Sequence, residues 1–309
     1  MTITAQHLPT PDLALRTTDL AELRRVRSFA HEQAAVAEAA GRRIRSTAPT
    51  PGRDRERVLE AVHADLMAWR YRLASSTMRR LGTGLAHDAT RYRTRLSEAG
   101  PNYDRLGYLG RLREGAVWDE ATATYVGGRE TPAHRIMLDY GRAARERLDV
   151  EGAGDVLVNP VVLPDGTTIT GNSLVRGEAG KALGRELVER ITRRGGDPAR
   201  VEVGGEPVYA VTAPTASRAV MFRAALRLLS TAEEGDLRAW QEARYLVFQA
   251  PRTKKGSDAV SRTFLVAVGA VLLGTPPTMP QDADLRCMVL GQPAATAMPG
   301  DPLAATAAR

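Results

Sequence analysis

Residues 250–273 read APRTKKGSDAVSRTFLVAVGAVLL, a basic loop that leads into the longest apolar run of the chain. Pro251 predicts that the preceding helical pattern ends, because a residue before proline avoids the helical conformation. Ser257 is a favourable N-cap for a new helix, with Asp258 in its first turn. The apolar run, Thr263–Leu273, is about half as long as a bilayer span. The stretch therefore predicts two helices joined by a short loop, and no membrane span.

The basic loop is unusual for its lysines. Only three of the forty-three basic residues are lysines, namely Lys181 and the adjacent pair Lys254 and Lys255. The free N–H groups at the start of the following helix carry partial positive charge and suit an anion. Lysine adds a point charge to such a site, and arginine adds a bidentate fork. We therefore predict a phosphate-binding site with these members: Arg252, Lys254, Lys255, the amides of Gly256 and Ser257, and Arg262.

Two other interpretations of this loop stay open. In one, the lysines solvate an exposed turn and Ser257 is only a helix cap. In the other, the loop contacts the phosphate backbone of a nucleic acid. The loop is not a Walker A sequence, since the G-x-x-x-x-G-K-[ST] spacing is missing. The cofactor is left open, with a nucleotide and Mg²⁺ as candidates, and the loop offers no catalytic residue.

Helical periodicity dominates the rest of the chain. Apolar residues recur at helical spacing in six further segments, which are 19–45, 54–81, 134–148, 180–194, 217–230 and 236–249. Residues 155–170 are rich in β-branched side chains and contain a turn at Pro164-Asp165-Gly166, and 201–211 has the pattern of a hairpin with a Gly-Gly tip. The predicted fold is mainly α (α+β), with a helical N-terminal region packed on a helical core that carries a small antiparallel β element.

This pattern divides the chain into four parts. Residues 1–18 are predicted to be flexible, and residues 19–150 form the helical region. Residues 151–274 form the α+β core. Residues 275–309 are rich in proline and alanine and lack aromatic anchors, so we expect a flexible tail.

Amino-acid composition argues against several classes of protein and of binding site. A net charge of +7 permits contact with nucleic acid or acidic ligands, but acidic residues are interleaved with the arginines, as on a solvated helical surface. Aromatic residues make up only 5%, which argues against base-stacking platforms. The single cysteine, Cys287, excludes a disulfide framework and a multi-cysteine zinc site. No H-x-x-x-H or H-E-x-x-H spacing exists, so no metal site is predicted. Without a visible secretion signal, we expect a cytoplasmic protein that does not contact membranes.

The loop and its flanking helices resemble the core of Fic/Fido proteins, which transfer AMP or another phosphate-bearing group onto hydroxyls. The hallmark of that family is H-P-F-x-[DE]-G-N-G-R-x-x-R, between two core helices. Here Pro251 matches, and Gly256–Arg262 keeps the spacing from the glycine to the second arginine. The resemblance covers residues 195–274. It implies that the hairpin 201–211 corresponds to the flap that positions the target.

Three of the positions that depart from that motif carry the chemistry of the family. Ala250 stands where the family has its catalytic histidine, Lys254 or Lys255 where it has a metal-binding acidic residue, and Ala259 where it has the first arginine. A general base for attack by a hydroxyl is therefore missing from the expected place. A lysine could supply the charge that Mg²⁺ places on phosphate. The resemblance implies a scaffold that holds phosphate, with the AMP-transfer chemistry lost or rebuilt.

Two further stretches are rich in cations. The arginines around the end of the second long helix predict a solvated helix end, or a phosphate or nucleic-acid patch, and they are Arg72, Arg79, Arg80, Arg91, Arg93 and Arg95. The glycine-rich stretch 177–185 opens a helix and holds Lys181. We expect an intracellular, transferase-like protein that binds a phosphate-bearing small molecule such as a nucleotide. The alternative is a basic module that binds nucleic acid or protein without catalysis.

Overall fold

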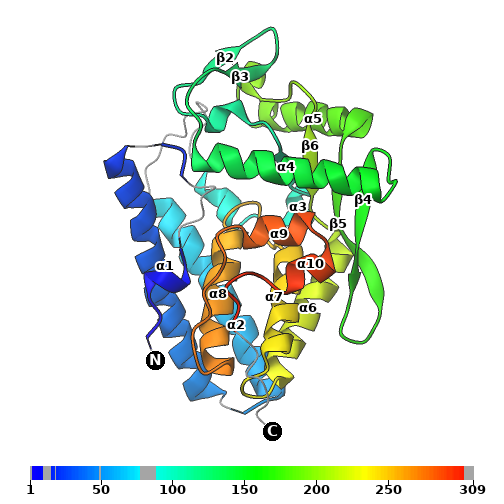
Figure 1. Ribbon diagram of the computed structural model, residues 1–309. Coiled ribbons are helices and arrows are strands. Elements are labelled where there is room, and N and C mark those ends of the chain that lie inside the picture. Colours follow the sequence, from blue (N-terminus) through cyan, green and yellow to red (C-terminus); the bar gives the residue numbers. More distant parts are fainter. Residues whose placement is uncertain (1, 10–14, 18, 49, 77–87, 303–309) are drawn as a thin grey trace.

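The computed structural model describes residues 2–9, 15–17, 19–48, 50–76 and 88–302. It is mainly α-helical with a small antiparallel sheet, as the sequence predicts. The larger core of the described part is a bundle of long helices, namely α1 (Leu20–Thr47), α2 (Arg53–Ser76), α6 (Thr215–Thr231), α7 (Leu237–Gln249) and α8 (Ser257–Leu272). These helices fill the lower half of Figure 1.

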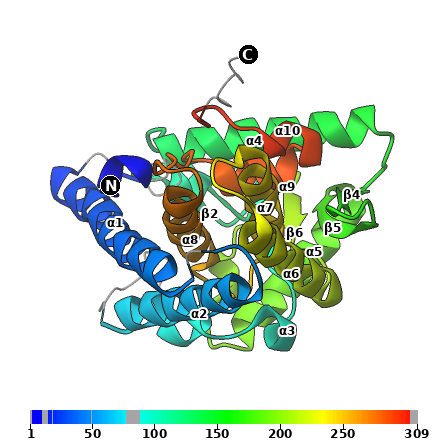
Figure 2. The same ribbon diagram turned by 90° about the horizontal axis from the view of Figure 1, so that it is seen from below.

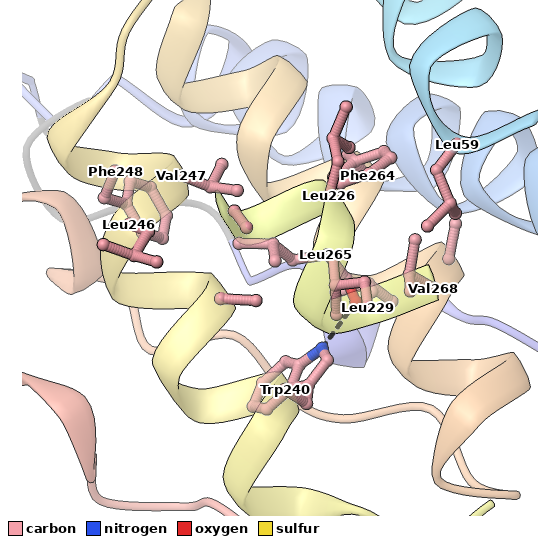
Figure 3. Packing of buried hydrophobic residues seen from close by; sticks show 14 of the residues in the cluster. Leu59, Leu226, Leu229, Trp240, Leu246, Val247, Phe248, Phe264, Leu265 and Val268 are labelled. Atoms are coloured by element: carbon pink, nitrogen blue, oxygen red, sulfur yellow. Dashed lines mark hydrogen bonds between the residues drawn. The ribbon is translucent and has the colours of Figure 1, made fainter. Parts of the chain in front are cut away.

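Helix α8 is the centre of this bundle. Its residues from Ala259 to Ala270 are all buried, which is the expected place for a helix that is apolar on every face. Figure 2 shows α8 enclosed by α1, α2 and α7, each of which packs against it. In Figure 3 the side chains of Phe264 and Leu265 meet residues of α2, α6 and α7, and the Trp240 indole N–H donates to Leu265 O at 3.0 Å.

A four-stranded antiparallel sheet lies beside the bundle, in the order β1–β6–β5–β4. Its strands are β1 (Tyr103–Leu106), β4 (Val156–Val162), β5 (Thr168–Val175) and β6 (Val208–Val211). Strands β4 and β5 form the hairpin predicted around Pro164-Asp165-Gly166, and the Gly166 N–H donates to Leu163 O at 2.9 Å across its turn. A separate two-stranded ribbon consists of β2 (Val117–Asp119) and β3 (Thr124–Val126).

Helices cover this sheet and build a second core. Helix α4 (Pro132–Val150) lies across the end of the bundle in Figure 1 and packs on β1, β6 and α9 (Ala283–Val289). Helix α5 (Gly177–Thr192) follows β5 and packs on β6. The short elements of the described part are η1 (Ala5–His7), η3 (Ala89–Tyr92), α3 (Leu96–Ala99), η4 (Gly110–Leu112), η5 (Pro198–Arg200) and α10 (Gln292–Thr296).

The segment 201–211 is not a hairpin, so this prediction was wrong, and with it the implied flap. Only Val208–Val211 forms a strand, β6, and this strand pairs with β1 and β5 inside the sheet. The physical reason lies at Glu202, whose buried carboxylate accepts hydrogen bonds from the Gly110 N–H at 2.6 Å and the Thr124 hydroxyl at 2.6 Å. These bonds hold the start of the segment against η4 and β3 instead of against β6.

Both segments for which the composition predicts flexibility are packed where the structure describes them. Ile3 and Leu8 are buried beside α1, and the Ile3 N–H donates to the Glu38 carboxylate at 3.0 Å. Beyond residue 274, α9 and α10 pack on α7, and Met279 and Cys287 are fully buried. Side chains of α7 hold this segment, since Gln249 donates to Cys287 O at 2.6 Å and Arg244 forms an ion pair with Asp301. Aromatic anchors on the segment itself are therefore not needed.

No helix in the described part of the chain is both long enough and apolar enough to cross a bilayer.

Candidate anion-binding site

The loop between α7 and α8 is fixed along its length by residues 91–96. The Leu96 N–H donates to Arg252 O at 3.0 Å, and the N–H groups of Lys254 and Lys255 donate to Thr94 O and Arg91 O at 3.0 and 3.1 Å. Main-chain polar groups that are paired in this way hold a loop in one conformation. The two lysine side chains therefore extend from a backbone of fixed conformation. The lysine amides are already paired, so they cannot bind a ligand.

Gly256, and not Ser257, is the N-cap of α8. Gly256 has a positive φ of 81°, a conformation that glycine adopts without a steric penalty. The Ser257 hydroxyl is used elsewhere, because it accepts a hydrogen bond from the Thr253 N–H at 3.1 Å. The first helical N–H with a main-chain acceptor is that of Val260, which donates to Gly256 O. Among the described residues, the amides of Gly256, Ser257 and Asp258 have no acceptor, so the predicted positive helix start is present.

The start of α8 opens into a cavity of about 460 Å³, which we call the apolar cavity. Its walls come from β1, η4, α4, α5, α7 and α9 together with the lysine loop. Most of the wall is aliphatic or aromatic, with Leu109, Leu112, Met137, Val247, Phe248 and Leu285 among its residues. The charged side chains that line it in the described part are balanced, with Arg16, Arg105, Arg111, Lys254 and Lys255 opposite Asp104, Asp197, Glu202, Asp258 and Asp284.

A second cavity of about 460 Å³, which we call the cationic cavity, adjoins the first. The two share the wall formed by Asn102, Tyr103, Asp104, Leu187, Lys254 and Lys255. In the described part, the cationic cavity is lined by Arg91, Arg190, Arg193, Arg194 and both lysines, with only Asp88 and Asp104 as acidic residues. The lysine pair therefore stands between a cavity with balanced charge and one with a strong excess of positive charge.

The electrostatics of this wall act on the two lysines. Burial, followed by repulsion from Arg190, Arg91 and Arg194, lowers the pKa of Lys254 to about 8. Burial and repulsion from Arg91 and Arg194 also lower the pKa of Lys255 to about 8. The Lys254 ammonium donates to Gly100 O and Pro101 O at 3.2 and 3.0 Å, whereas the Lys255 ammonium makes no hydrogen bond to any described residue. An anion would relieve the repulsion at both.

Asp104 is the carboxylate on the shared wall. Its side chain is exposed to the solvent that fills the cavities, yet protein atoms surround it, and the resulting desolvation raises its pKa to about 6. Lys254 and Arg91 oppose this rise by stabilising the ionised form. At pH 7 most of this carboxyl group is ionised, and it lies beside the candidate phosphate site.

Four of the six predicted site residues line the cavities. Lys254 and Lys255 line both, and Gly256 and Ser257 line the apolar cavity. Arg252 does not join them. Its guanidinium lies over the Phe222 ring at 4.6 Å, and it lines a separate recess together with Arg95.

Arg262 does not turn toward the lysines either. It is only 2% exposed, and its guanidinium donates to the Asp258 carboxylate at 2.7 Å, to Gln281 O at 2.8 Å and to the Asp284 carboxylate at 3.2 Å. Burial and repulsion from Asp258 raise the pKa of Asp284. Arg262, itself buried, thus neutralises two partly exposed carboxylates and ties α8 to the segment around the start of α9.

The arginines at the end of α5 are site residues that the sequence does not predict. Arg190, Arg193 and Arg194 reach the cationic cavity from the carboxyl end of that helix, whereas Lys181, which drew attention to α5, lies exposed near its amino end in an ion pair with Glu178. Arg91 was noted only as part of a different arginine-rich stretch. The adjacent pair Arg193-Arg194 before Gly195 is a local signal, but only the packing of α5 shows which cavity it faces.

Other candidates from the sequence contribute less. Arg93 lies over the Tyr71 ring at 4.9 Å, and Arg79 and Arg80 lie outside the described residues. His63 is buried against Phe222 and Phe264, and burial lowers its pKa to about 3. In the described part of the chain, no group of three His, Cys, Asp or Glu side chains could hold a metal ion.

Compared with known protein families and curated proteins, the chain matches no family model and no individual sequence.

Proposed function

We propose that this protein binds a phosphate-bearing small molecule, such as a nucleotide, at Lys254 and Lys255. The observation that carries the proposal is the position of this pair on the wall between the apolar cavity and the cationic cavity. A nucleotide has an anionic end and a flat, largely apolar end. These two ends match the cationic lining of one cavity and the apolar lining of the other. Ligand sites are commonly concave, mostly apolar and equipped with a few polar groups that fix the orientation.

The local chemistry supports phosphate over other anions. The two ammonium groups supply point charges, and the unpaired amides of Gly256 and Ser257 at the start of α8 supply directed N–H donors. This combination of a helix start with cationic side chains is suited to the several oxygens of a phosphate. A carboxylate ligand, with two oxygens, would leave more of these donors without an acceptor.

We also propose that the protein transfers a phosphate-bearing group at this site, which is the reaction that the Fic resemblance implies. Ala250 cannot act as a base, so another group must accept the proton of an attacking hydroxyl. Asp104 is the candidate, because it is solvent-accessible in the cavities, lies beside Lys254 and is mostly ionised at pH 7. If it is the base, Asp104→Asn would retain ligand binding and lose turnover.

The position of the lysines between two concave sites favours a small ligand over the nucleic-acid alternative. A protein that binds a nucleic-acid backbone uses an open groove that follows successive phosphates, and its affinity falls steeply with salt. The lysines here are partly buried and stand between two bounded cavities. The alternative would be supported if an oligonucleotide bound through Lys254 and Lys255 and its affinity fell steeply with salt concentration.

The test is a thermal-shift panel of nucleotides, sugar phosphates and coenzymes on three proteins. These are the wild type, the double variant Lys254→Ala/Lys255→Ala and the control Lys181→Ala, which removes the chain's remaining lysine from an exposed helix face. At a hundredfold excess over Kd, a ligand stabilises the native state by about 2.7 kcal/mol. We expect this stabilisation in the wild type and in Lys181→Ala.

The double variant should lose this stabilisation while keeping its own folding transition. Equal shifts in the double variant and the wild type would place the ligand elsewhere. The absence of any shift in the wild type across the whole panel would contradict the proposed function.

A further inference from the structure

The cationic cavity is built by side chains that converge from three separate segments. Arg91 comes from η3, Arg193 and Arg194 from the end of α5, and the lysines from the loop before α8. These segments lie far apart in the sequence, and their cations meet on the far side of Lys254 and Lys255 from most of the apolar cavity. Cations gather in this way in a folded protein at a cost in repulsion, unless an anion offsets it.

The charges of this cavity are only partly matched within the protein. Arg190 forms an ion pair with Glu186 and donates to the Tyr103 hydroxyl at 2.9 Å, so its charge is accounted for. Arg91, Arg193 and Arg194 form no ion pair with any described residue. Asp88 and Asp104 lie near enough to stabilise the charge of Arg91, but two carboxylates cannot balance this number of cations.

Arg91 gives a second indication of a missing partner. Its Nε is buried and has no hydrogen-bond acceptor among the described residues. A buried donor that stays unpaired costs free energy, and in native proteins such a group calls for an explanation. An oxygen-rich anion in the cavity would relieve the electrostatic strain around this guanidinium and would pair with its outward N–H groups.

We propose that the cationic cavity is the subsite for a second phosphate group, so that the ligand carries a di- or triphosphate and not a single phosphate. This inference rests on the proposed function, because the first phosphate is placed at Lys254 and Lys255. The ligand then runs from the apolar cavity, past the lysine pair, into the cationic cavity. Arg91, Arg193 and Arg194 contact the outer phosphate, and the lysines bridge the inner and outer groups.

The experiment compares inorganic phosphate, pyrophosphate and tripolyphosphate by titration calorimetry. The test variant is Arg193→Gln/Arg194→Gln, in which both exchanged side chains are exposed, so that folding should be retained. The matched control is Arg185→Gln, which removes an exposed arginine of the same helix outside both cavities. We expect tripolyphosphate to bind the wild type about tenfold more tightly than phosphate for each additional phosphate that is engaged.

In the Arg193→Gln/Arg194→Gln variant the tighter binding of tripolyphosphate relative to inorganic phosphate should disappear, while all affinities of the control stay unchanged. If the wild type binds phosphate but tripolyphosphate no more tightly, the second subsite is wrong and the proposed function survives. If the wild type binds none of the three probes and no nucleotide, both proposals fail. If a single-stranded oligonucleotide binds more tightly than tripolyphosphate, and if the Arg193→Gln/Arg194→Gln variant no longer binds it, the subsite belongs to a nucleic-acid backbone and the inference is overturned.

Discussion

Helix α8 begins and helix α5 ends at the candidate site, yet they use arginine in opposite ways. Helix α8 is buried on every face, and its Arg262 is 2% exposed and held by two carboxylates and two carbonyl groups. In the described part of α5 only Gly180 and Gly184 are buried, and Arg193 and Arg194, just beyond its last residue, are exposed. The same residue type therefore stabilises the core in one helix and remains available to a ligand near the other.

The difference follows from the surroundings and not from the side chain. A guanidinium that is removed from water must be paired on all sides, because an unpaired buried charge is costly. A guanidinium on an exposed helix end keeps its hydration and can exchange water for a phosphate. Substitutions near the two helix ends should therefore separate effects on stability from effects on binding.

The largest effect is expected for Arg262→Ala. This change removes a buried guanidinium and leaves the partly exposed carboxylates of Asp258 and Asp284, together with Gln281 O, without their donor, so the free energy of unfolding should fall by about 3 kcal/mol. Urea denaturation followed by circular dichroism measures the loss. Arg193→Ala, the comparison near α5, should change the free energy of unfolding by less than about 0.5 kcal/mol.

A second substitution tests the assigned cause. Adding Asp284→Asn to Arg262→Ala removes one of the two repelling carboxylates and should recover part of the lost stability. If Arg262→Ala costs no more than Arg193→Ala, the contrast between the two helices is wrong. If Asp284→Asn brings no recovery, the cost arises from lost packing and not from charge.

The next effect concerns Gly256, which starts α8 and supports the lysine loop. A Cβ atom at this position would lie 2.6 Å from Tyr92 Cδ1 and 2.9 Å from Arg70 Cγ, in addition to the strain of a positive φ. Gly256→Ala should therefore destabilise the protein by about 2–3 kcal/mol. The control is Gly195→Ala, where φ is also positive at 74° but no atom lies within 4 Å of the added Cβ.

Gly195→Ala should cost about 1 kcal/mol, the strain of the backbone alone. The difference between the two variants, measured by chemical denaturation, isolates the contact with Tyr92 and Arg70. Equal losses in both would show that the start of α8 can move away from η3 and α2, and the loop would then be less rigid than its hydrogen bonds indicate.

The remaining effect is a pH dependence, and it concerns ligand affinity instead of the free energy of unfolding alone. The pKa values of Lys254 and Lys255 are lowered to about 8 in the folded protein, so both lose protons well below the ordinary pKa of lysine. Phosphate binding favours the protonated form, and the Kd for a nucleoside triphosphate should therefore rise above pH 8, by up to about tenfold per pH unit for each lysine. Calorimetric titrations at pH 7, 8, 9 and 10 measure this rise.

The same shift has the opposite sign for stability. These lysines hold protons less tightly in the folded chain than in the unfolded one, because their ammonium groups are partly buried and are repelled by the arginines. Their charged forms therefore lower stability below pH 8, and this part of the stability is recovered as the pH rises from about 8 toward 10.5. Lys254→Ala/Lys255→Ala should remove both dependences. An affinity that stays constant up to pH 10 would separate the lysines from the ligand.

Local patterns predict much of this molecule. Helical periodicity places α1, α2, α4, α5, α6, α7 and α8, and the turn at Pro164-Asp165-Gly166 places the β4–β5 hairpin. The predicted hairpin at 201–211 fails because Glu202 is recruited by η4 and β3, which lie about ninety residues earlier. The predicted flexible tail differs from the structure for a similar reason, since the groups that hold it, Gln249 and Arg244, are on α7.

Residue order alone predicts that a lysine pair precedes an apolar helix. This prediction depends on residue type, short-range spacing and the free N–H groups at a helix start, which neighbouring residues decide. Only the tertiary structure decided which cations face one another. It placed Arg262 against the carboxylates of Asp258 and Asp284 and Arg252 over the Phe222 ring, and it brought Arg91, Arg193 and Arg194 to the lysines. The reason is that a long side chain takes its direction and its partners from the elements packed around it, and no local spacing records those.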